Sequence, residues 1–202
     1  MWVDGSAGLP YTTQEKNIFT AAVRFLDHKS NTWTEFVLLS MHKYRRCYAT
    51  DAECIAVHEA FRLASRLTDE FDLLVILSDC QTVVRGIRDR TLPRHLCDTS
   101  WATSLFWYAN MLNDLGIVVE LRWVPGHSKV EGNEQVDVLA RQSRVCAQMW
   151  LGQNVQDLML QNVTIMARSR QSILLAIRRK IDWRAGNEKD YGELCYEEIT
   201  TT

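Results

Sequence analysis

The chain has 202 residues, of which 47% are hydrophobic and 24% are charged, which is the range of ordinary globular proteins rather than of fibrous or disordered ones. Its length fits one domain of about 150 residues with an appended segment. The net charge of −2 argues against a generally basic nucleic-acid binder. However, 17 of the 23 cationic residues are arginine, so a local phosphate-binding stripe remains compatible with the composition.

The sequence also indicates the compartment of the protein and the oxidation state of its cysteines. No apolar run approaches the roughly 20 residues needed to cross a membrane, and the first residues show no secretory signal. The six cysteines are scattered without a C-x-x-C pair, which favours reduced thiols over a disulfide framework or a zinc site. We therefore expect an intracellular protein, in the cytoplasm or the nucleus.

The first half of the chain predicts an antiparallel start followed by a helix. Residues 2–4 read as the end of a strand that runs into a turn region. Residues 17–27 and 32–40 predict a hairpin, and 51–67 carries apolar residues at helical spacing. Only three residues precede Asp4, which suggests a chain cut from a longer polypeptide.

The second half alternates strands and helices. Residues 73–77 form a compact apolar run without alternation, typical of a parallel strand covered on both faces. Two helices, a strand and a last helix are expected in turn at 81–88, 101–115, 117–123 and 132–149. The order β-β-β-α-β-α-α-β-α predicts an α/β domain with a mixed sheet and helices on both faces.

We place the domain at residues 1–149 and a C-terminal extension at 150–202. The extension is expected to be helical and basic over 155–184, with a loose acidic tail at 187–202. Its arginines would either bind phosphate or form the exposed side of a helix packed on the domain. The second interpretation is preferred because Ile165, Ile173 and Ile177 give the segment an apolar side.

The stretch from Trp123 to Asp137 is the most informative part of the chain. It sets His127 on a glycine-flanked loop between a strand and a helix, and Asp137 on the first turns of that helix. A mobile proton carrier near a fixed carboxylate is a common requirement of phosphodiester hydrolysis.

Three further acids stand at the edges of predicted elements, and each has an ordinary structural alternative. Asp4 would be a turn aspartate, Glu53 the third residue of a capping box begun by Thr50, and Asp79 a helix cap. Asp137 would be an exposed helix acid. Together, however, the four acids would converge at the crevice where parallel strands end. Such a group repels itself unless cations bind, and carboxylate ligands suit magnesium or manganese rather than zinc.

In this combination the chain resembles type 1 ribonuclease H, and among these the domains of retroelement reverse transcriptases and their fungal-type relatives. Four matching segments appear in family order over residues 2–145: Asp4-Gly5-Ser6, Asp51-Ala52-Glu53, Leu77-Ser78-Asp79-Cys80-Gln81, and Trp123-Val124-Pro125-Gly126-His127 through to Asp137. The resemblance implies a ribonuclease H-like α/β fold, with a mixed five-stranded sheet flanked by helices and here a helical C-terminal extension.

The resemblance also implies a chemistry: two-metal hydrolysis of the RNA strand of an RNA–DNA hybrid. Asp4, Glu53, Asp79 and Asp137 would hold two Mg²⁺ ions, with Mn²⁺ as a substitute. One ion would prepare the attacking water and the other would stabilise the leaving 3′ oxygen. His127 would assist proton transfer or product departure, and Glu53 would lie near the 2′-hydroxyl.

Substrate contacts are implied in the same way. Gly5 and Ser6 would offer backbone N–H groups to the RNA strand, and Gln81 would reach base edges in the minor groove. Asn133 would orient the last metal ligand, although for Gln81 and Asn133 ordinary capping is an equal alternative. Trp123 is expected in the core at a strand end rather than as a stacking platform.

The family's basic handle has no counterpart after Asp79, so isolated activity would be weak and depend on a partner domain, such as a reverse transcriptase upstream. Arg85, Arg88, Arg90, Arg94 and His95 would replace the handle only in part, and a solvated charged loop is the preferred interpretation of these residues. One alternative function keeps the fold without the chemistry: a retroelement-derived module that binds nucleic acid or protein and does not cut. The presence of all four acids favours the enzyme. A proofreading exonuclease or transposase is disfavoured because the exonucleases have a second acidic residue two positions after the first, and this chain has Ser6 there.

Overall fold

The structure is a computed structural model, and it describes residues 1–8, 17–27, 29–42, 48–92, 100–152 and 163–167. The strands are β1 (Trp2–Ala7), β2 (Asn17–Asp27), β3 (Thr32–His42), β4 (Leu73–Ser78), β5 (Val118–Trp123) and β6 (Val163–Ala167). The helices are α1 (Ala49–Ala64), α2 (Gln81–Arg88), α4 (Ser100–Asp114) and α5 (Glu131–Gly152), with a 3-10 turn, η1 (Thr68–Glu70). None of the described helices is long and apolar enough to cross a membrane.

The strands form one mixed sheet in the order β5-β4-β1-β2-β3-β6. β1, β2 and β3 pair antiparallel, whereas β4 lies parallel to both β1 and β5. Strands β1 to β5 confirm the mixed five-stranded sheet that the resemblance implies, and β6 adds a sixth strand beside β3. β1 is a central strand. Trp2 at the start of β1 pairs with Leu77 near the end of β4, so Asp4 lies close to the residues that follow β4.

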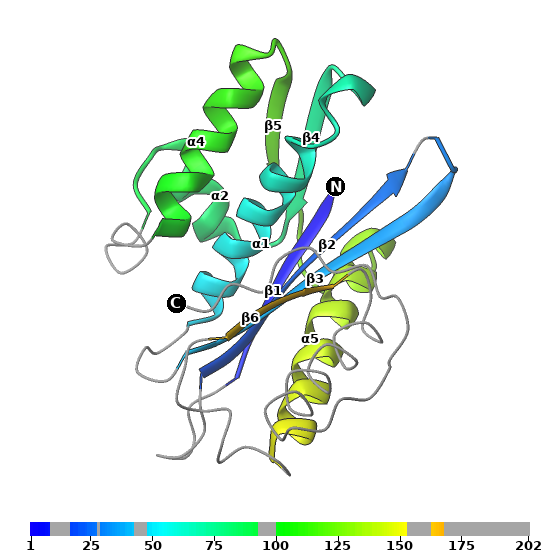
Figure 1. Cartoon of the computed structure of the whole chain (residues 1–202), viewed down its shortest axis with the longest axis vertical. Coiled ribbons are helices and arrows are strands. Elements are labelled where there is room, and N and C mark those ends of the chain that lie inside the picture. Colours follow the sequence, from blue (N-terminus) through cyan, green and yellow to red (C-terminus); the bar gives the residue numbers. More distant parts are fainter. Residues whose placement is uncertain (9–16, 28, 43–47, 93–99, 153–162, 168–202) are drawn as a thin grey trace, which may run out of the picture.

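Helices cover both faces of the sheet (Figure 1). α1 packs on β1, β2 and β4 and against α4, while α5 crosses the opposite face over β1, β2 and β3. Phe19, Leu38, Phe61, Ile76 and Leu105 are fully or almost fully buried in the core. The hydroxyl of Thr20 donates to the Ala140 carbonyl (2.7 Å), a buried bond that ties α5 to β2.

The prediction that residues 73–77 are covered on both faces is wrong. Leu74 and Ile76 are buried toward α1, but Leu73, on the other face of β4, is 48% exposed. The physical reason is that α5 packs over β1, β2 and β3, so its apolar side does not extend across β4.

β1 is longer than the sequence suggests, because it continues through Gly5 and Ser6 to Ala7. These residues pair with Ala21, Thr20 and Phe19 of β2. Asp4 therefore lies within a strand instead of at its end, and its interpretation as a turn aspartate is wrong.

The C-terminal extension contributes a strand where a helix was expected. Residues 163–167 form β6, which pairs antiparallel with residues 37–41 of β3, so the helical prediction over 155–184 is wrong for these five residues. Val163, Thr164 and Ile165 are β-branched and favour a strand, and the edge of β3 offers unpaired N–H and C=O groups. The rest of 155–184 and the tail at 187–202 lie outside the described residues. α5 continues to Gly152, past the domain boundary placed at 149.

Candidate active site

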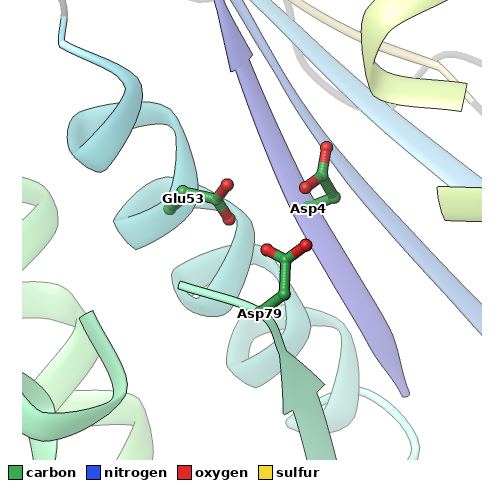
Figure 2. A group of neighbouring side chains, drawn as sticks. All are labelled: Asp4, Glu53 and Asp79. Carbon is green, nitrogen blue, oxygen red and sulfur yellow. The ribbon is translucent and has the colours of Figure 1, made fainter. Parts of the chain in front are cut away.

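Three of the predicted acids converge. Asp4 on β1, Glu53 on α1 and Asp79 just after β4 each offer a carboxylate oxygen, and these oxygens lie within 4.8 Å of one another. Figure 2 shows the three carboxyl groups directed toward a common space from the three elements. Segments far apart in the sequence therefore meet in a single acidic pocket.

Gly5 allows the first two acids to meet. A Cβ atom at this position would overlap the backbone of Ala52 and Glu53, so β1 and α1 touch backbone to backbone. Only glycine permits so close an approach. The contact places Glu53 beside Asp4, one residue away along β1.

Asp79 is held from three sides. Asn133 Nδ2 donates to Asp79 Oδ2 (3.0 Å), and Trp123 Nε1 donates to the Asp79 carbonyl oxygen (3.0 Å). Gly126 lies so close that a Cβ there would be 2.7 Å from Asp79 Oδ2. The loop before α5 therefore packs directly against this carboxylate.

Burial and mutual repulsion perturb the protonation of the pocket. Burial raises the pKa of Asp4 to about 8, with further increases from the charges of Asp79 and Asp137. Burial also raises the pKa of Glu53 well above its ordinary value, and Asp4 and Asp79 add to the shift. A hydrogen bond between the two carboxyl groups stabilises charged Asp4 and protonated Glu53.

The residues fit a divalent cation. Glu53 Oε2 is buried and has no hydrogen-bond partner, although buried polar atoms are normally paired. A bound cation would satisfy this oxygen and offset the repulsion that raises the two pKa values. The donors are all carboxylate oxygens, which hard cations prefer.

The other predicted residues lie around the pocket without joining it. Asp137, partly buried on α5, is outside the group of close oxygens, although its charge acts on Asp4. His127 is exposed at a left-handed turn (φ 52°), and Gln81 is exposed at the start of α2. Asn133 is buried, but its amide contacts Asp79 and not Asp137, the ligand that it was expected to orient.

The structure also decides the capping alternatives. The residue before α1 is Tyr48, whose N–H donates to Asp51 Oδ2 (2.8 Å), so Thr50 and Glu53 do not form the capping box. The residue before α2 is Cys80, so Asp79 is not its cap.

A sequence model describing RNase H matches residues 2–144. The chain belongs to the ribonuclease H family. Members of this family act on RNA–DNA hybrids and generally depend on divalent metals. Among solved structures, the chain is similar to the crystal structure of RNase H1 from the halophilic archaeon Halobacterium salinarum NRC-1, with 15% sequence identity and a TM-score of 0.45. The match covers 70% of this chain and 92% of the archaeal chain. No curated protein matches the chain.

Sequence reasoning missed three features of this ribonuclease H site. Trp123, expected in the core, is 47% exposed and positions Asp79 through its indole nitrogen. It is exposed because β5 lies at an edge of the sheet. Gly126 contacts Asp79 closely, and Arg144 donates to the Ser6 hydroxyl (2.9 Å). The Trp-Val-Pro-Gly-His motif was a signal for the first two, whereas nothing local marks Arg144.

Proposed function

We propose that this chain is an endonuclease that hydrolyses the RNA strand of RNA–DNA hybrids with two divalent cations, Mg²⁺ or Mn²⁺. The observation that carries the proposal is the convergence of the buried Asp4 and Glu53 with the partly buried Asp79, in a chain of the ribonuclease H family.

In this proposal Asp4, Glu53, Asp79 and Asp137 would together hold the cations. The cations would supply Lewis-acid activation of water and neutralise charge on the leaving oxygen. The partly buried position of Asp137 and its electrostatic effect on Asp4 support a role beside the three closer acids.

The chain's own residues orient the site and handle protons. Asn133 holds the side chain of Asp79, and Trp123 holds its backbone carbonyl. His127 lies in the exposed loop that packs on Asp79 through Gly126. From this exposed position His127 would assist proton transfer or product departure.

Substrate contacts belong to the same proposal. Glu53 would sense the 2′-hydroxyl that distinguishes RNA from DNA. Gly5 and Ser6 would contact the RNA strand, and the exposed Gln81 would reach base edges. A reverse transcriptase domain upstream would serve as partner, with residues 1–149 as the catalytic unit.

Cleavage of a labelled RNA–DNA hybrid in Mg²⁺ tests the proposal. We expect the wild type to cut the RNA strand internally, and Asp79→Asn to reduce the rate by more than about 100-fold, since it removes a metal ligand. Asp114→Asn removes the same charge from an exposed position at the end of α4 and should leave the rate unchanged. Chelation of divalent ions should stop the reaction.

The outcome also separates the two functions that this fold supports. A wild type that binds the hybrid but leaves the RNA intact in both Mg²⁺ and Mn²⁺ would contradict the nuclease. That result would favour a retroelement-derived binding module.

A further inference from the structure

Arg144 on α5 is fixed beside the end of β1 by neutral groups. Its Nε donates to Ser6 Oγ (2.9 Å), and its Nη1 donates to Gln148 Oε1 (2.8 Å). Neither the Ser6 hydroxyl nor the Gln148 amide carries a negative charge. The two bonds use two of the five N–H groups of the guanidinium and hold its plane in place.

The environment of this cation is unfavourable for it. Burial lowers the pKa of Arg144, and the charge of the exposed Arg141 lowers it further. Among the described residues no carboxylate pairs with Arg144, and a cation held partly out of water without a counter-ion costs free energy. A bound anion would relieve this cost.

Arg144 contacts the face of β1 that carries Asp4. Ser6 is on the face of β1 that carries Asp4, two residues further on and roughly 7 Å away. Along α5, Arg144 follows Asp137 by about two turns, or about 10 Å. At the strand end, a Cβ on Gly8 would lie 2.7 Å from Gln148 Nε2 and 3.6 Å from Arg144 Nη1, so the backbone approaches both side chains closely.

We propose that Arg144 binds a backbone phosphate of the nucleic-acid substrate beside the carboxylate pocket. The identity of the ligand rests on the function proposed above. A planar guanidinium with free N–H groups matches the oxygens of a phosphate. Because phosphate contacts fix register rather than sequence, Arg144 acts as a positioning residue that sets the strand against the metal ligands.

The first test measures hybrid affinity against salt concentration in Mg²⁺, in an Asp79→Asn background that prevents cutting. We expect Arg144→Gln to weaken binding about tenfold, the loss of one charge-assisted contact. The slope of log affinity against log salt should fall by about 0.9, the value for one phosphate. Arg144→Lys should keep the slope of the parent but bind more weakly, because it retains the charge and loses the fork.

Lys29→Gln is the matched control, because it also removes one positive charge. Lys29 lies in the turn after β2 and pairs with Glu70 (2.6 Å). β2 separates this turn from Thr20, the residue opposite Ser6, by roughly 24 Å. The control should change neither affinity nor slope. Equal affinities and slopes for the parent and Arg144→Gln would overturn the proposal, even if the wild type cuts hybrids.

The second test places single neutral methylphosphonate linkages along each strand. One linkage within about three nucleotides of the cut should weaken binding by the parent and leave Arg144→Gln unaffected. If every linkage weakens both proteins equally, Arg144 does not hold a phosphate. The midpoint of thermal unfolding shows whether each variant folds. If Arg144→Gln does not fold, Arg144→Lys replaces it, and the expected result is an unchanged midpoint with weaker binding. If the parent shows the expected dependence on Arg144 but the wild type never cuts hybrids, the phosphate contact stands and only the proposed nuclease activity is refuted.

Discussion

At Asp4, burial and the charges of neighbouring acids both oppose ionisation. It is only 5% exposed, faces two other acids of the pocket, and has a pKa raised to about 8 against an ordinary 3.8. In the absence of cations the folded protein therefore keeps a proton that the unfolded chain releases near pH 4. Cation binding and proton release are consequently linked in this pocket.

This linkage predicts how stability depends on pH. Between about pH 4 and pH 8 the folded state binds more protons than the unfolded state, so stability is greatest at the acidic end. The free energy of unfolding should fall by up to about 1.4 kcal/mol per pH unit for each retained proton. Urea titrations of the metal-free protein across this range measure the slope.

Asp4→Asn provides the control for this measurement. The variant should show a smaller decline, because only Glu53 then retains a proton, and Mg²⁺ should flatten the decline in the wild type. An identical slope in the wild type and in Asp4→Asn would contradict the assignment of the proton to Asp4.

Residue types at motif positions were predictable, whereas their partners were less so. The convergence of Asp4, Glu53 and Asp79 was predictable from the order of motifs and from the rule that ligand crevices form at strand ends, but Asp4 lies within β1 and reaches Asp79 because Trp2 pairs with Leu77. The bond between Asn133 and Asp79 and the contact of Arg144 with Ser6, 138 residues away, depend on how α5 rotates over the sheet. No local pattern specifies that rotation.

At the scale of elements, α1 carries a buried ionic network on the side away from the pocket. Glu59 is fully buried, accepts from Arg62 Nε (2.7 Å), and lies 3.0 Å from His58 Nδ1. His58 Nε2 in turn is 2.9 Å from the Ser104 hydroxyl of α4, and Arg62 stacks over the Phe36 ring of β3. The network connects α1 to its neighbours, and Glu59 is the anion at its centre.

Glu59→Ala should therefore destabilise the fold by about 3–5 kcal/mol, because it leaves the buried Arg62 without a counter-charge. Glu70→Ala, which breaks the exposed pair with Lys29, should cost no more than about 1 kcal/mol. Denaturant titrations compare the two variants. Similar losses would show that burial of Glu59 is not what makes its pair important.

The boundaries of elements show where local patterns suffice. The predicted bounds of β2 and α2 agree with the structure because periodic apolar residues mark them directly. The start of α1 was placed at residue 51 instead of Ala49, since the bond from Tyr48 N–H to Asp51 was not recognised. The extent of β1 depended on pairing with β2, which is not a local property.

At the scale of the whole molecule, the sheet is bounded by β5 on one side and β6 on the other (Figure 1). β6 lies far from β3 in the sequence, and its backbone covers an edge that would otherwise present a row of unpaired groups. The sequence predicts a basic helix here because Ile165, Ile173 and Ile177 give the longer segment 155–184 an apolar side. Long-range pairing decided between a helix and a strand.

Two proline substitutions test this pairing. Along an edge strand, successive N–H groups point alternately to the neighbouring strand and to solvent. Of Ile165→Pro and Met166→Pro, one should therefore remove a ladder hydrogen bond and the other should not. We expect one variant to lose hydrogen-exchange protection at the amides of residues 37–41 and to self-associate. Unchanged exchange in both variants would show that β6 does not cover β3 in solution.

The direct contact between β1 and α1 at Gly5 has a consequence for divergence. Peptide groups have the same dimensions in every sequence. The distance between Asp4 and Glu53 is therefore set by main-chain geometry and does not depend on the surrounding apolar side chains. Hydrophobic positions elsewhere are free to drift over generations while the distance between those acids is preserved. Gly5 itself has no such freedom, and a methyl group there would push the strand and the helix apart.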